Sequence, residues 1–200
     1  MKYSLVLIGA HNGVKTKSMV ERAAALGPVL LVEPVPWLFA SLAEMYAGNP
    51  SVTLLQAAVA DTDQEQVSFF APKPTANSVA PYGDQLGSLE RSHATNHNPG
   101  FSDAVEEITT RAMSLPTLLS TYDIEYIDTL ITDTEGHDAR ILVNFPFRKF
   151  RPRQIMFEFK HSDGTFHIGK RLAHLLVVLE THGYRNRVID AENCLATLSA

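Results

Sequence analysis

The segment Leu5–Thr16, LVLIGAHNGVKT, joins an apolar run to a turn with two glycines and a Lys-Thr pair. Glycines after a buried strand let the backbone approach a nucleotide closely. The Walker phosphate loop needs Gly-x4-Gly-Lys-Ser/Thr, and the dinucleotide turn needs Gly-x-Gly-x-x-Gly. Gly9 and Gly13 are four positions apart, and Val14 separates Gly13 from Lys15, so neither pattern fits. The turn predicts close contact with a different kind of ligand, and a nicotinamide oxidoreductase is disfavoured.

Glu33 ends the next apolar run about 20 residues after the turn, where dinucleotide-binding folds place an acidic residue. A carboxylate at this position can accept hydrogen bonds from both hydroxyls of a ribose. Because the glycine spacing lacks the pyrophosphate pattern, an adenosine ligand without a pyrophosphate is favoured, and S-adenosylmethionine is the obvious one. The alternative is that Glu33 only places a negative charge at the N-terminus of the following helix.

The elements that position these residues alternate between short apolar runs and helical patterns. Strands are expected at 3–8, 29–33, 51–60, 66–70, 126–132 and 154–159, and helices at 14–26, 36–48, 137–145 and 169–183. The regular pattern, interrupted after the strand at 66–70, resumes at 115–122. The tail 184–198 reads as two strands joined in a hairpin at DAEN. This alternation predicts an α/β fold with a parallel sheet covered on both faces and one antiparallel strand near an edge.

In such sheets the ligand lies beyond the carboxyl ends of the strands. The residues that follow the predicted strands are therefore the candidate site. They are Gly9–Gly13, Glu33, Gln56–Ala58, Asp133–Asp138 and Glu158–Gly164.

Several segments resemble the FkbM family of S-adenosylmethionine-dependent methyltransferases: IGAHNG, LLVEPVPWLFASL, LLQAAVADTD, LPTLL and above all IDTLITDTEGHDARIL. They occur in the family's order over nearly the whole chain. The resemblance implies the class I methyltransferase fold, a Rossmann-like three-layer sandwich. Its seven-stranded, mostly parallel sheet has the order 3-2-1-4-5-7-6, with strand 7 antiparallel. The resemblance also implies O-methyl transfer, commonly to a hydroxyl of a sugar or secondary metabolite.

The resemblance also implies the cofactor site, residue by residue. The residues it matches are Gly9, Ala10, Asn12 and Gly13 in the cofactor turn, Glu33 at the ribose, Ala57 and Ala58 beside the adenine, and Asp133 and Glu135 in an Asp-x-Glu-Gly motif. His11 lies in the turn and is expected to contact the cofactor rather than the substrate.

Leu7 departs from the family pattern, because an aspartate usually stands two positions before the first glycine of the turn. That carboxylate helps to hold the methionine end of the cofactor, and losing it can cost roughly 1–3 kcal/mol of binding. Either another group such as Asp133 compensates, or the cofactor binds weakly. The rival hypothesis is therefore a non-catalytic module of the same fold that binds S-adenosylmethionine or another adenosine ligand.

Methyl transfer to a hydroxyl requires an aligned acceptor and a base that removes its proton. Histidine suits this role near neutral pH. His137 and His161 both follow predicted strands and are the candidate bases. Asp133 and Glu135 are expected to organise the methionine end of the cofactor and the acceptor.

A metal ion offers a second, less favoured route, and we expect no resident metal. Asp133, Glu135 and Asp138 supply oxygen atoms that can bind a divalent cation. His93 and His97 have the i, i+4 spacing of a zinc pair. Their segment looks unstructured, however, and no third ligand is evident nearby.

Between residues 72 and 107 the regular pattern gives way to Pro, Gly, Ser, Asn and His. A loop of this length inside a compact domain is often a lid or a binding loop. We therefore expect one methyltransferase domain over 1–200 with a lid at about 72–107. A disordered insertion is the alternative.

The composition limits the class of protein and its partners. Two hundred residues with 45% hydrophobic and 20% charged residues are typical of one soluble globular domain. A formal charge of −5 without a basic stripe argues against nucleic-acid and anionic-membrane partners. The acceptor that the family resemblance implies is a small molecule or a glycan. One cysteine, Cys194, and the lack of any apolar run near the roughly 20 residues of a membrane span favour a cytoplasmic protein.

Overall fold

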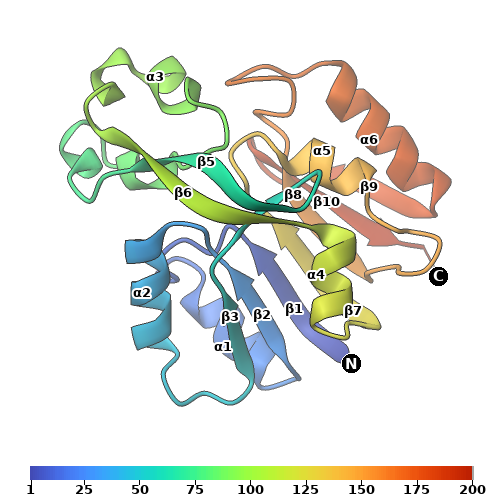
Figure 1. Cartoon of the computed structure of the whole chain (residues 1–200). Helices are drawn as coiled ribbons and strands as arrows, with labels where there is room; N and C mark the ends of the chain where they lie inside the picture. Colours follow the sequence, from blue (N-terminus) through green and yellow to red (C-terminus); the bar gives the residue numbers. More distant parts are fainter. Residues whose placement is uncertain (200) are drawn as a thin grey trace.

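The computed structural model describes residues 1–199, and its main sheet has seven strands in the order β3-β2-β1-β7-β8-β10-β9 (Figure 1). The strands are β1 (Lys2–Ile8), β2 (Val29–Val32), β3 (Val52–Leu55), β7 (Tyr126–Thr132), β8 (Gln154–Glu158), β9 (Tyr184–Val188) and β10 (Asn193–Leu198). β10 runs antiparallel to β8 and β9, whereas the other neighbouring pairs are parallel. The predicted order 3-2-1-4-5-7-6 with an antiparallel strand 7 is confirmed.

Helices cover both faces of this sheet. α1 (Lys17–Ala24) and α2 (Pro36–Met45) pack on one face, and α4 (Leu115–Thr121), α5 (Asp138–Val143) and α6 (Lys170–Thr181) pack on the other. Side chains of β1 alternate between the two cores, as the two-residue period of a strand requires, and these three layers confirm the predicted sandwich. No helix within residues 1–199 is long and apolar enough to cross a membrane.

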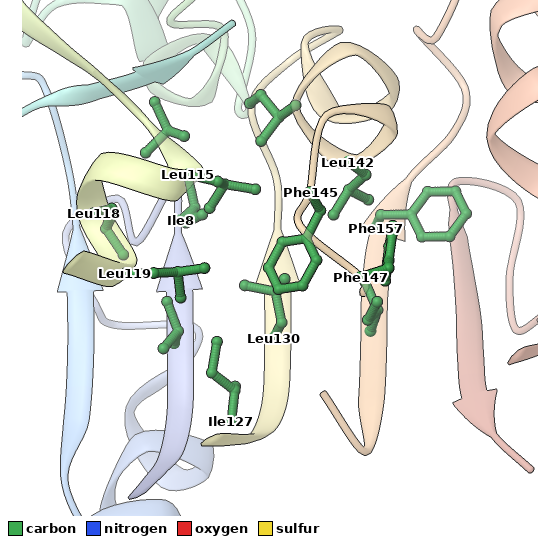
Figure 2. Packing of buried hydrophobic residues seen from close by; sticks show 14 of the residues in the cluster. Ile8, Leu115, Leu118, Leu119, Ile127, Leu130, Leu142, Phe145, Phe147 and Phe157 are labelled. Carbon is green, nitrogen blue, oxygen red and sulfur yellow. The ribbon is translucent and has the colours of Figure 1, made fainter. Parts of the chain in front are cut away.

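The larger core lies between the sheet and the helices α4, α5 and α6. Figure 2 shows Leu119 of α4 over β1 with Leu118 beside it, Phe145 over β7, and Phe147 and Phe157 at β8. Each fully buried leucine or phenylalanine side chain contributes about 1.5–3 kcal/mol relative to exposure in water. This packing fixes the strands whose carboxyl ends carry the polar residues.

A second, three-stranded sheet departs from the sequence prediction. The strand expected at 51–60 is interrupted after Leu55, and its second half, β4 (Ala58–Ala60), pairs with β6 (Val105–Ser114) instead. β5 (Gln64–Pro72) completes this sheet in the order β4-β6-β5. β6 was not predicted, because charged residues and threonines at its exposed positions conceal the few apolar ones.

The segment between β5 and β6 is not the unpatterned loop that the sequence suggested. It holds four short helical pieces, namely η1 (Ala76–Ser78), η2 (Gly83–Gln85), α3 (His93–His97) and η3 (Pro99–Phe101). A small core that includes Ala94 and Phe101 supports them. Pieces this short do not repeat an apolar position at helical spacing, so the sequence pattern did not reveal them. In Figure 1 the segment lies beyond the ends toward which β1 and β7 point.

β1 and β7 lie unusually close where they end. The amide of Asp133 donates to the carbonyl oxygen of Ile8 at 2.9 Å. Gly9 comes next with φ +83°, and a Cβ on it would lie 1.8 Å from the carbonyl oxygen of Asp133. Only glycine therefore allows the two strand ends to meet while the chain turns away.

We expect Gly9→Ala to destabilise the protein by at least about 2 kcal/mol more than Gly48→Ala. Gly48 also has a positive φ, +77°, but a Cβ there would meet nothing within 4 Å. Both substitutions place an alanine in a left-handed backbone conformation. The difference between their losses of stability therefore measures the clash with Asp133. Urea unfolding of the two variants supplies the comparison, and equal losses of stability would contradict the close approach.

Candidate active site

A cavity of about 940 Å³, including its open mouth, lies at the carboxyl ends of β1, β2 and β7. Its walls come from the glycine turn, the residues after β2, the break between β3 and β4, the loop after β7 and part of the segment 73–104. Every residue predicted to bind the cofactor lines it: Gly9, Ala10, His11, Asn12, Gly13, Glu33, Ala57, Ala58 and Asp133. The structure thus brings these residues together, while their individual roles remain predictions.

Glu33 ties the glycine turn to the end of β2. Its carboxylate accepts hydrogen bonds from the amides of His11 and Val35, each at 2.9 Å. Burial raises the pKa of Glu33 to about 7, although the two amides lower it. A carboxylate has about four acceptor positions, so two remain for ribose hydroxyls. The bond to Val35, just before α2, also supports the start of that helix, so both expected roles of Glu33 are compatible.

The glycine turn contacts η2 across the mouth of the cavity. His11 has φ +54°, and its Nε2 lies 3.0 Å from the carbonyl oxygen of Asp84. Lys15 donates to the side-chain oxygen of Gln85 at 2.6 Å. Asp84, Gln85 and Lys15 all line the cavity, and none was predicted as a site residue. Their positions depend on the contact between two segments some 70 residues apart, which no local pattern signals.

Leu7 faces away from the cavity. It is buried with Leu5, Leu31 and Ile131 on the side of the sheet that α1 and α2 cover. A carboxylate at this position would have to be buried among apolar side chains, which costs several kcal/mol without compensating hydrogen bonds. Asp133, in contrast, lines the cavity.

The loop after β7 forms an acidic wall. The side chain of Asp133 lines the cavity and is accessible to solvent there, yet the surrounding protein together with the charge of Asp138 raises its pKa to about 7. Glu135 also lines the cavity, and burial raises its pKa well above the ordinary value. His137 is buried beside them, and burial lowers the pKa of its imidazole. Its Nδ1 has no hydrogen-bond partner among residues 1–199.

His161 and Asp138 lie outside the cavity lining. Asp138 accepts hydrogen bonds from the amide and hydroxyl of Thr134, at 3.2 and 2.8 Å, and so holds the loop after β7. His161 is completely buried, with its Nε2 3.7 Å from Oε2 of Glu135. The oxygen group expected from Asp133, Glu135 and Asp138 does not form. The carboxylates that converge are Asp133, Glu135 and Glu158.

Three histidines gather around Glu135, which the sequence did not predict. The side chains of His93, His97, His161 and Glu135 each place one ligand atom within 4.8 Å of the others. The expectation that no third ligand lies near His93 and His97 is therefore wrong. The i, i+4 pair was visible in the sequence, but its partners come from distant loops. Burial lowers the pKa of His93 and His97 to about 4 and that of His161 to about 3, so all three are neutral.

The sequence profile described as the methyltransferase FkbM domain matches residues 8–186. The chain belongs to the FkbM methyltransferase family. S-adenosylmethionine is the cofactor typical of this family, so the predicted family and cofactor are confirmed, and the protein is an S-adenosylmethionine-dependent methyltransferase. No curated protein sequence matches the chain significantly.

Solved structures share the fold of this FkbM chain at low sequence identity. The precorrin-6y C5,15-methyltransferase of Geobacter metallireducens GS-15 is 12% identical with a TM-score of 0.53, covering 99% of this chain and 81% of that one. A Methanococcus jannaschii fibrillarin, a pre-rRNA processing protein, is 14% identical with a TM-score of 0.50, covering 98% of this chain and 66% of that one. The chain thus spans about two thirds of the fibrillarin's length. These likenesses show the fold.

The cavity of this FkbM protein fits S-adenosylmethionine. Gly9 lines the cavity with its backbone alone, because the position cannot accommodate a side chain. Glu33 keeps acceptor positions for hydroxyls, and Asp133 offers a carboxylate that can accept from an ammonium group.

The raised pKa of Glu33 predicts how stability depends on pH. Its pKa is about 7 in the folded protein and 4.5 in the reference state, so folding favours the protonated form. The contribution of Glu33 to stability is therefore complete below pH 4.5 and is lost as the pH rises through 7. Relative to Glu33→Gln, which cannot titrate, the unfolding free energy of the wild type should fall by about 2 kcal/mol between about pH 5 and 8.

Chemical unfolding of both proteins across this pH range measures the difference. The loss of a hydrogen-bond acceptor in Glu33→Gln adds an offset that is independent of pH, so only the slope matters. Parallel curves would show that the pKa of Glu33 does not change on folding.

Proposed function

We propose that this protein transfers the methyl group of S-adenosylmethionine to a hydroxyl oxygen of a small molecule or glycan. One observation supports this proposal above the others. The cavity that contains all the expected cofactor residues also contains Asp133, Glu135 and His137. Acceptor chemistry at a hydroxyl needs a group that takes up a proton, and these side chains supply carboxylates and an imidazole beside the cofactor site.

The glycine turn and Glu33 hold the adenosine part of the cofactor in this proposal. The backbone of the turn lies against the ligand, and Glu33 accepts from the ribose hydroxyls while its remaining oxygen positions anchor His11 and Val35. Asp133 accepts from the ammonium group at the methionine end. It thereby takes the role that the family usually gives to the position of Leu7, whose side chain is buried on another face.

The transfer itself is a displacement at the methyl carbon. The sulfonium is the electrophile: the oxygen–carbon bond to the acceptor forms as the carbon–sulfur bond breaks, leaving S-adenosylhomocysteine. The chain positions the acceptor oxygen in line and removes its proton. We assign the proton to the imidazole of His137, which lines the cavity. Its buried Nδ1 has no hydrogen-bond partner within residues 1–199. His161 does not line the cavity, so direct proton transfer to it is disfavoured.

The segment 73–104 acts as a lid over the bound cofactor. Asp84, Gln85, Gly87 and Leu89 of this segment already line the cavity, and the contacts of His11 and Lys15 hold η2 across its mouth. A lid that closes in this way excludes water from the methyl transfer. The binding-module alternative rested on Leu7, and because Leu7 faces away from the cavity no structural observation favours it.

We expect Glu33→Gln to weaken binding of S-adenosylmethionine and S-adenosylhomocysteine about 10- to 100-fold, because a hydrogen bond to a charged carboxylate contributes about 1.5–3 kcal/mol. Isothermal titration calorimetry measures both affinities. Glu44→Gln, on the exposed side of α2, is the matched control and should bind like the wild type. Unchanged affinity in Glu33→Gln with an intact fold would remove Glu33 from the cofactor site.

We expect His137→Gln to lower the turnover of a hydroxylated acceptor by about 100- to 10,000-fold while leaving the affinity for S-adenosylmethionine within about threefold. Acceptors are found by screening sugars and other polyhydroxylated molecules for formation of S-adenosylhomocysteine. Carbon-13 NMR of the product made from methyl-labelled cofactor should show a methoxy signal. An N-methyl or C-methyl signal would contradict O-methyl transfer, and full turnover in His137→Gln would exclude it as the base.

A further inference from the structure

We infer that His93, His97 and Glu135 form a binding site for a divalent transition-metal ion of the Zn²⁺ type at the wall of the cavity. The site is argued from the positions of these three side chains alone. Its use on the methyl acceptor rests on the function proposed above.

The two histidines come from one short helix and face the same way. His93 and His97 are the first and last residues of α3, four positions apart, and residues at this spacing lie on one face of a helix. Their ring centroids are 4.8 Å apart. Around a single ion with Zn–N bonds of about 2.0–2.1 Å, two imidazole centres lie about 4.5–5.2 Å apart. The rings therefore already have the separation that one shared ion requires.

Glu135 supplies the third ligand from the loop after β7. Its Oε2 lies 2.8 Å from Nε2 of His93, and the ligand atoms of the cluster all lie within 4.8 Å of one another. Tetrahedral zinc needs ligand atoms about 3.3–3.5 Å apart, which lies between the 2.8 Å contact and the 4.8 Å upper bound of the cluster. Glu135 has φ +51°, which is uncommon for a residue other than glycine and directs its carboxylate into the cluster.

The hydrogen bonds around the histidines leave the required lone pairs free. Nδ1 of His93 lies 3.3 Å from the hydroxyl oxygen of Thr165, which can accept a hydrogen bond from its N–H. Nε2 of His93 then presents a lone pair to the carboxylate of Glu135, and two acceptors at this distance need a cation or a proton between them. Nε2 of His97 is buried and has no hydrogen-bond partner in the described part of the chain. Metal-bound histidines commonly have this arrangement, with the other ring nitrogen held by a neighbour.

His161 completes the surroundings without being a ligand. The amide of Phe166 donates to its Nδ1 at 2.8 Å, so its Nε2 carries the proton of the neutral ring. This Nε2 is buried without a partner among residues 1–199 and faces Glu135. It can donate to Glu135 or to an oxygen bound at the ion. The ring of Phe166 lies against His97 and His161, with centroids 4.4 and 5.0 Å away, and shields the cluster from water.

Two imidazoles and one carboxylate are a ligand set of catalytic rather than structural metal sites. Such sites leave one coordination position open for water or substrate, and imidazole favours Zn²⁺, Fe²⁺ or Ni²⁺ over Mg²⁺. Glu135 belongs both to this cluster and to the cavity lining. An ion there can lower the pKa of an acceptor hydroxyl that reaches its open position from the Glu135 side of the cavity.

Metal binding to the full chain tests the site without reference to activity. Protein stripped with a chelator is titrated with Zn²⁺ in competition with a chromophoric chelator, and with Co²⁺ while its visible absorption is recorded. We expect one ion per chain and an affinity at least about 100-fold lower in His97→Ala and in Glu135→Gln. His174→Ala, at an exposed position of α6, is the control and should bind like the wild type. Circular dichroism confirms that each variant is folded.

Stoichiometric binding that is lost in both variants supports the site. If the wild-type protein binds Zn²⁺ no more tightly than Glu135→Gln does, the metal site is overturned. A shared proton alone would then join His93 and Glu135. Calorimetry with S-adenosylmethionine on the same variants keeps the two proposals apart. A variant that no longer binds the metal but keeps its affinity for S-adenosylmethionine shows that the two sites are separate. If the stripped enzyme methylates as fast as the loaded one, the role of the ion toward the acceptor is overturned.

Discussion

The contact between Gly9 and the carbonyl of Asp133 is the constraint on which the site depends. Two parallel strands approach so closely at their ends that no side chain fits between them. The first strand must therefore end in a glycine turn, and the loop after the second strand supplies the polar residues Asp133, Glu135 and His137. The result is a cavity with bare backbone and Glu33 on one wall and Asp133, Glu135 and His137 on another.

Burial gives these polar groups their chemistry. A carboxylate that the surrounding protein shields from bulk water loses part of the solvation of its charge, so the pKa values of Glu33 and Asp133 both rise to about 7. The same loss of solvation keeps the nearby imidazoles neutral. Neutral imidazoles and carboxylates that exchange protons near neutral pH can take up a proton or hold a cation. Such groups are costly to bury, and the large core beneath α4, α5 and α6 offsets that cost (Figure 2).

The sequence predicted the main sheet well, because β1, β2, β7 and β8 are short, largely apolar runs followed by or ending in glycine or acidic residues. The residues at those strand ends, from Gly9 to Asp133, could be named for the same reason. It did not predict β6 or the helices of 73–104, whose polar residues carry no apolar repeat. The gathering of His93 and His97 with Glu135 was invisible, because it depends on how an irregular segment packs on a loop some 40 residues away. Leu7 could be recognised as a departure, but only its packing shows that it faces the core.

The central claim is that one cavity holds the cofactor between Glu33 and Asp133, with the acceptor beside Glu135 and His137. A crystal structure of the protein with S-adenosylhomocysteine tests it most directly. The account predicts ribose hydroxyls within hydrogen-bond distance of Glu33, the ammonium group at Asp133, and the sulfur facing the loop after β7. Density for the ligand outside this cavity, or a ribose that does not contact Glu33, would contradict it.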